Sequence, residues 1–205
     1  MAQALTTLFV EAGHEVRLTN SRGPESLGEL VSTFGPSVQG STVAAAVPWA
    51  DAVFLATPWG KTADAVSVVG DWTGVVVVDT TNNRTKPGPD GLIDIGDSVS
   101  SVNVAGYLPG ARVIKAFNVT PIPWMAAALG VGVSDTNAVY VAGDDAAAKA
   151  LVSEIITSIG GVAVDAGDLE TGGRLLGMGG ALASTLEMLS PEDARSRVEA
   201  TRTGQ

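Results

Sequence analysis

The 205-residue chain contains no cysteine and only one histidine, His14. The absence of thiols excludes disulfides, thiolate metal sites and cysteine nucleophiles. A single histidine also excludes a metal site built from several histidines, and a Ser-His-Asp triad unless His14 itself acts. His14 follows Gly13 in an expected helix-to-strand turn, so we predict a solvated, structural role for it.

Positive charge and long apolar runs are also scarce. The chain has 12 Lys and Arg against 22 Asp and Glu, which gives a net charge of −10. Neither a nucleic-acid backbone nor an anionic membrane is therefore an expected partner. We recognise no signal peptide in this sequence and no apolar run of the roughly 18 residues that a bilayer span needs. We expect a cytoplasmic protein with small-molecule cofactors as partners, and we leave a homodimer open.

Short apolar stretches with strand character alternate with helical stretches along the sequence. The expected strands are 15–20, 38–42, 51–57, 74–80, 112–118, 138–143 and 161–164. The expected helices are 1–12, 24–34, 43–49, 59–69, 98–108, 123–129, 145–159 and 169–189, the last interrupted by glycines. This alternation predicts an α/β protein with a Rossmann-type, doubly wound and mostly parallel sheet. We expect one domain over 1–189 and a polar, frayed tail over 190–205.

Ligands of this fold bind beyond the carboxyl ends of the strands. Ser21 and Arg22 follow the strand 15–20, where an NAD enzyme usually has an acidic residue for the ribose 2′-hydroxyl. A hydroxyl and a guanidinium instead suit a 2′-phosphate, which matches the arginine fork. The pair therefore favours NADP over NAD. The alternative is a polar turn that only introduces the next helix.

Five other residues follow strands or lie in one. Pro58 and Trp59 could form an apolar wall against a nicotinamide, or could start and pack a helix. Asn82 could bind a ligand at the mouth of the loop 81–96, or could form a turn, and Asn118 could cap the next helix. Lys115 lies inside a strand, where a buried lysine is rare unless it is paired.

These positions include no evident general base, nucleophile or set of metal ligands. Hydride transfer between two bound rings depends on proximity, orientation and a dry pocket more than on acid–base side chains. The sequence therefore favours an oxidoreductase that passes hydride between two cofactors over a hydrolase or a group transferase.

Several segments resemble those of one family in the same order. They are LFVEAGHEV, TNSRGPESL, LATPWG, VVVVDTTN and VIKAFNVTP. Over about residues 1–185 the chain is similar to the NADPH-dependent reductases of coenzyme F420, the deazaflavin-dependent NADP oxidoreductases. The resemblance implies NADP(H) as cofactor and coenzyme F420 as co-substrate. It also implies that Ser21 and Arg22 bind the 2′-phosphate, that Thr57, Pro58 and Trp59 line the nicotinamide, and that Asn118 and the stretch 177–180 border the deazaflavin.

The start of the chain departs from that family. Its members have a strand and a G-x-G-x-x-[GA] turn before the first helix. We expect these to be missing from this sequence, through a start assigned to an internal methionine or a chain that is truly short. In that case NADPH would bind weakly and strand edges would be exposed. The alternatives to an F420 reductase are an NADPH-dependent reductase of another acceptor, such as an imine, a quinone or a ferric complex, and a non-catalytic dinucleotide-binding protein.

Overall fold

A computed structural model of the chain describes residues 1–86, 89–133, 136–183 and 188–203, and shows the expected alternation of strands and helices. The strands are β1 (Val16–Leu18), β2 (Val38–Gly40), β3 (Val53–Leu55), β4 (Val76–Asp79), β5 (Arg112–Ala116), β6 (Asn137–Gly143) and β7 (Gly161–Gly167). The helices are α1 (Ala2–Glu11), α2 (Gly28–Ser32), α3 (Val43–Ala46), α4 (Thr62–Val66), α5 (Ser100–Gly106), α6 (Ile122–Ala128), α7 (Ala146–Ser158), α8 (Thr171–Leu176) and α9 (Pro191–Thr203).

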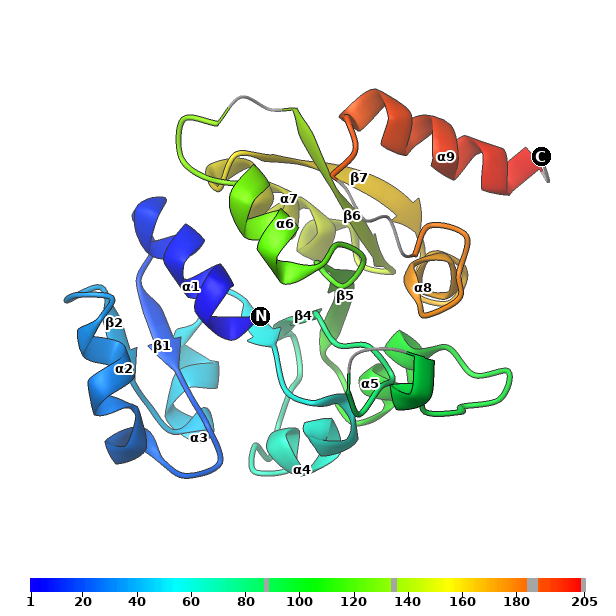
Figure 1. The fold of residues 1–205 in the computed structure, drawn as a ribbon. Helices are drawn as coiled ribbons and strands as arrows, with labels where there is room; N and C mark the ends of the chain where they lie inside the picture. Colours follow the sequence, from blue (N-terminus) through cyan, green and yellow to red (C-terminus); the bar gives the residue numbers. More distant parts are fainter. Residues whose placement is uncertain (87–88, 134–135, 184–187, 204–205) are drawn as a thin grey trace.

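The described strands form two separate sheets (Figure 1). β1 and β2 pair in parallel, and the second sheet has the order β3-β4-β5-β6-β7. Its pairings are parallel except for β5 with β6, which is antiparallel. The predicted α/β fold with a mostly parallel sheet is therefore confirmed. Within the described residues, β1 and β3 each keep one edge without a partner strand.

Helices cover both faces of the five-stranded sheet. Side chains alternate along a strand, so neighbouring residues of β4 point into different cores. Val76 and Val78 lie in the core under α1, α6 and α7, whereas Val77 lies in the opposite core with α4 and α5. α8 and α9 pack on β6 and β7 in a third core. The runs of valine in this sheet are thus buried on both sides, as the sequence indicates.

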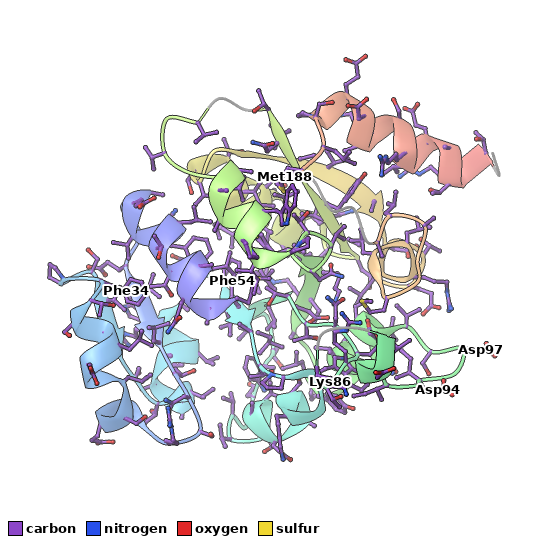
Figure 2. All side chains as sticks on the ribbon, viewed as in Figure 1. Phe34, Phe54, Lys86, Asp94, Asp97 and Met188 are labelled. Carbon is purple, nitrogen blue, oxygen red and sulfur yellow. The ribbon has the colours of Figure 1, made fainter. Side chains whose placement is uncertain are left out.

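Aromatic side chains join α1 to the larger sheet. Figure 2 labels Phe54 of β3, which lies beside α1. Its ring centroid is 4.8 Å from that of Phe9 on α1 and 6.0 Å from that of Phe117, which directly follows β5. α1 is therefore anchored on the sheet near the end of β5.

Two expectations for the last third of the chain are wrong. Among the described residues of the helix expected over 169–189, only α8 is helical: it ends at Gly177, one of the expected interruptions, and the described residues after Gly177 do not resume it. The tail expected to fray forms α9, because Ala194 and Val198 are buried against β6 and β7. The division into a domain over 1–189 and a tail stays a prediction. Across the described part of the chain, every helix is too short or too polar to span a bilayer.

Candidate functional site

Three neighbouring strands of the larger sheet end level with one another. Leu55 of β3 is in register with Asp79 of β4, and Asp79 with Lys115 of β5. Thr80 ties the first two ends together, because its N–H and its hydroxyl donate to the Leu55 carbonyl at 3.3 and 2.8 Å. These strands are parallel, so the segments that follow them leave the sheet at one edge, where α/β sheets bind ligands. We call this the β3–β5 edge.

The structure brings two of the predicted site residues, Asn82 and Asn118, together at this edge. Asn82 Nδ2 donates to the Asn118 backbone carbonyl at 2.9 Å, and Asn118 Nδ2 donates to Asn82 Oδ1 at 3.0 Å. Asn118 Nδ2 also donates to the Leu176 carbonyl at the end of α8, at 2.7 Å. The two amides therefore link the segments after β4 and β5 to α8. That either amide contacts a cofactor stays a prediction.

A buried ion pair lies directly before this amide pair in both strands. Lys115 Nζ is 2.9 Å from Asp79 Oδ2, and both side chains have no exposed surface. Lys115 also donates to the Thr81 carbonyl. From the sequence, a lysine inside a strand is rarely buried unless it is paired. The structure shows Lys115 both buried and paired with Asp79. Sequence reasoning missed Asp79, although an acidic residue directly after the valine run 75–78 was an available signal.

Two buried polar atoms near this edge lack a hydrogen-bond partner within the described residues, Asn118 Oδ1 and Trp59 Nε1. A buried donor or acceptor without a partner costs about 1–3 kcal/mol. Asn118 also follows Phe117, whose φ of 62° lies in the left-handed region that a bulky side chain rarely adopts. Unsatisfied atoms and backbone strain of this kind are typical of ligand sites.

The segment after β3 is only partly packed. The hydroxyls of Thr57 and Thr62 are 3.0 Å apart, which ties the strand end to the start of α4. Pro58 is exposed, and Trp59 is half-buried against the core that contains α4 and α5. Trp59 therefore packs in part against this core. A role for Thr57, Pro58 and Trp59 beside a nicotinamide stays a prediction.

Ser21 and Arg22 lie elsewhere, in the loop after β1 of the smaller sheet, and both are exposed. Asn20 organises this loop: its Oδ1 accepts from the Arg22 N–H at 2.9 Å, and its Nδ2 donates to Ser26 Oγ at 2.9 Å. Within the described residues, the Arg22 guanidinium has no carboxylate within ion-pair distance. Its charge is thus available to an anionic ligand, which the overall charge of −10 would otherwise disfavour.

Several titratable side chains have structural partners. The described part of the chain holds no group of three or more His, Asp or Glu side chains that could bind a metal ion. His14 is half-buried, and its Nε2 is 2.7 Å from Ser158 Oγ, a hydrogen bond between α7 and the turn after α1; a structural role for His14 stays a prediction. Hydrogen bonds from Thr171 lower the pKa of Asp168, and burial raises the pKa of Tyr140.

Comparison with known proteins places the chain in a family. Residues 1–83 match the model of the NADP oxidoreductases described as coenzyme F420-dependent. The chain belongs to this family. The resemblance seen in the sequence is thereby confirmed, and the protein is an NADP-dependent oxidoreductase. The matched residues run from α1 to the loop after β4, so they include all the predicted site residues except Asn118.

Several solved structures are similar to this chain. A hypothetical protein, SMa0349 from Sinorhizobium meliloti, is 35% identical with a TM-score of 0.80, over 92% of this chain and 89% of that one. A proposed F420-dependent NADP-reductase from Arthrobacter sp. FB24 shares the fold at 24% identity and a TM-score of 0.67, over 82% and 80% of the two chains. An imine reductase from Bacillus cereus shares the fold at 22% identity and a TM-score of 0.59, over 84% of this chain and 52% of that one. No curated protein matches.

The family implies NADP(H) as cofactor, and the described residues fit this group. Arg22 offers an exposed guanidinium at the strand end that faces the adenosine ribose in this fold. At the β3–β5 edge, Trp59 Nε1 offers an unused donor, which the carboxamide oxygen of a nicotinamide can satisfy. The 2′-phosphate of NADP(H) therefore suits the loop that contains Arg22, and its nicotinamide suits the β3–β5 edge.

Proposed function

We propose that the protein transfers hydride between NADPH and a deazaflavin, coenzyme F420. One observation carries this proposal. At the β3–β5 edge, the side chains of Asn82 and Asn118 form a hydrogen-bonded amide pair just beyond the strand ends. Two rings that exchange a hydride need a fixed orientation and exclusion of water, and hydrogen-bonding amides on a rigid sheet supply the first.

Each predicted residue has a part in this proposal. Ser21 and Arg22 bind the 2′-phosphate, while Thr57, Pro58 and Trp59 line the nicotinamide. Asn82 and Asn118 border the space in which the deazaflavin lies over the nicotinamide. NADPH supplies the hydride when it is bound. The residues of the chain only bind and orient the two rings.

The test is to mix the purified protein with NADPH and oxidised coenzyme F420 and to follow the loss of the deazaflavin absorbance. We expect bleaching that depends on the protein and is faster with NADPH than with NADH. The same assay with a cyclic imine, a quinone or a ferric complex tests the other acceptors. Oxidation of NADPH by one of these, without bleaching of the deazaflavin, would reject F420 as the acceptor.

A further inference from the structure

We propose that the buried Asp79–Lys115 ion pair positions the Asn82–Asn118 amide pair for hydride transfer. The inference rests on the proposed function, because it assigns a task to residues that do not reach the ligand edge. Both charged side chains have no exposed surface, so neither can contact a bound ring. They are positioning residues, which act through the residues that follow them.

The ion pair holds Thr81 through three different groups. Asp79 Oδ1 accepts from the Thr81 N–H at 2.8 Å and from the Thr81 hydroxyl at 2.6 Å. Lys115 Nζ donates to the Thr81 carbonyl. Thr81 lies beyond the end of β4, where no strand pairing fixes the backbone. The ion pair therefore fixes both peptide units of a residue that would otherwise belong to a long loop.

Fixing Thr81 places Asn82, and Asn82 in turn is bonded to Asn118. Asn118 lies three residues after Lys115 in the chain, so the same ion pair restrains both amides, one through β4 and one through β5. The amide pair uses Asn82 Oδ1 and both Nδ2 groups, and leaves Asn118 Oδ1 without a partner. The network thus holds one unused acceptor in a fixed place at the β3–β5 edge.

Stability alone does not account for a buried ion pair. Removing two charges from water costs more than their attraction returns in many proteins, and apolar replacements of both partners are often neutral or stabilising. The other ion pairs among the described residues are at least partly exposed, such as Lys149–Asp165 with side chains 21% and 55% exposed. The only fully buried pair of the described chain is therefore the one beside the candidate site.

The experiment replaces both partners at once, as Asp79→Leu/Lys115→Met, so that no unpaired charge is left in the interior. We expect this variant to fold, to bind NADPH within about twofold of the wild type, since Arg22 lies on the other sheet, and to transfer hydride about 10- to 100-fold more slowly with both ligands saturating. The matched control is Lys149→Met/Asp165→Leu. It removes the ion pair between α7 and β7, whose N–O distance of 2.8 Å is close to the 2.9 Å of the Asp79–Lys115 pair, and it should leave the rate of hydride transfer unchanged.

A second variant covers the case in which the double replacement does not fold. Thr81→Val keeps the ion pair and loses only the hydroxyl bond to Asp79, and we expect a smaller loss of rate, about 3- to 10-fold, again with NADPH affinity unchanged. A folded Asp79→Leu/Lys115→Met variant that transfers hydride at the wild-type rate would overturn the proposal. So would a loss of NADPH affinity as large as the loss of rate.

Hydrogen exchange tests the positioning role of the ion pair independently of whether a deazaflavin is the hydride acceptor. With no ligand present, backbone amides of residues 81–83 should exchange faster in Asp79→Leu/Lys115→Met than in the wild type, and should not change in the control. If the wild type does not reduce the deazaflavin but exchange rises as expected, the proposed function fails and the positioning role stands. If the wild type reduces the deazaflavin and neither rate nor exchange changes in the variant, the positioning role fails and the function stands.

Discussion

Lys115 and Arg22 show two uses of positive charge in a strongly acidic chain. Lys115 is fully buried and neutralised by Asp79, so its charge organises the protein rather than a ligand. Arg22 is exposed and has no carboxylate partner within the described residues, so its charge remains available. Lys115 lies inside β5 and has a structural role, whereas Arg22 lies beyond the end of β1, where a ligand can reach it.

Replacement of Arg22 should weaken NADPH binding selectively. Hydrogen bonds to a charged group contribute about 1.5–3 kcal/mol each, so Arg22→Gln should raise the Kd for NADPH about 10- to 100-fold. The Kd for NADH, which has no 2′-phosphate, should stay within about twofold. Titration of the variant with both nucleotides by calorimetry measures the difference.

Arg202→Gln is the matched control for Arg22→Gln. It changes the net charge by the same amount at an exposed position in the last turn of α9. Equal weakening of NADPH binding by both replacements would show that the overall charge, and not a contact with Arg22, governs affinity. Equal weakening of NADPH and NADH binding by Arg22→Gln would also contradict a 2′-phosphate contact.

α8 is a short helix that begins beside a carboxylate and ends beside Asn118. Asp168 Oδ1 accepts from the Thr171 N–H at 2.6 Å and from its hydroxyl at 2.7 Å, which satisfies an N–H of the first turn. At the other end, the Leu176 carbonyl accepts from Asn118 Nδ2. α8 packs closely on the sheet, since a Cβ on Gly172 would come within 2.8 Å of the Ala142 Cβ.

Loss of the Asp168 carboxylate should destabilise the protein in a pH-dependent way. The hydrogen bonds from Thr171 lower the pKa of Asp168 in the folded state. The stabilisation is therefore fully present above the unfolded pKa of about 3.9 and is lost as the pH falls through the lower folded pKa. Asp168→Ala should lower the Tm by about 2–4 °C at pH 7, and the two Tm values should converge as the pH falls through the lowered folded pKa. A difference in Tm that persists at low pH would contradict this account.

The elements that local patterns define could be predicted from the sequence. The valine run of β4 and the alanine-rich α7, with its cap at Asp145, both lie where the patterns place them. α9 could not be predicted, because Ala194 and Val198 are buried only through contacts with β6 and β7. The same holds for the site. Asn82 and Asn118 were both suspected, but their mutual bonding depends on the register of β4 with β5.

The molecule as a whole is divided into a small and a large sheet. β1 and β2 pair over only three residues each, whereas the larger sheet has five strands covered by helices on both faces (Figure 1). A two-stranded sheet on its own is marginally stable at best. Arg22 follows the smaller sheet and the amide pair follows the larger one, so a bound dinucleotide would connect the two.

This division predicts unequal stability and a specific effect of NADPH. Amides of β1 and β2 should exchange with solvent faster than those of β4 and β5, because the smaller sheet can open without disrupting the larger one. Saturating NADPH should slow exchange in β1 and in the loop with Arg22, since binding opposes local opening. Hydrogen exchange followed by mass spectrometry measures both effects. Equal exchange in the two sheets, or no protection near Arg22, would contradict this description.

Direct hydride transfer between the two cofactors is the central claim, and isotope transfer tests it most directly. NADPH carrying deuterium at nicotinamide C4 is incubated in ordinary water with the protein and oxidised coenzyme F420, once for each C4 position. Ring-to-ring transfer predicts that one of the two labelled forms delivers its deuterium to C5 of the reduced deazaflavin, as measured by mass spectrometry. Reduced deazaflavin that contains no deuterium from either form, or no reduction at all, would contradict the account.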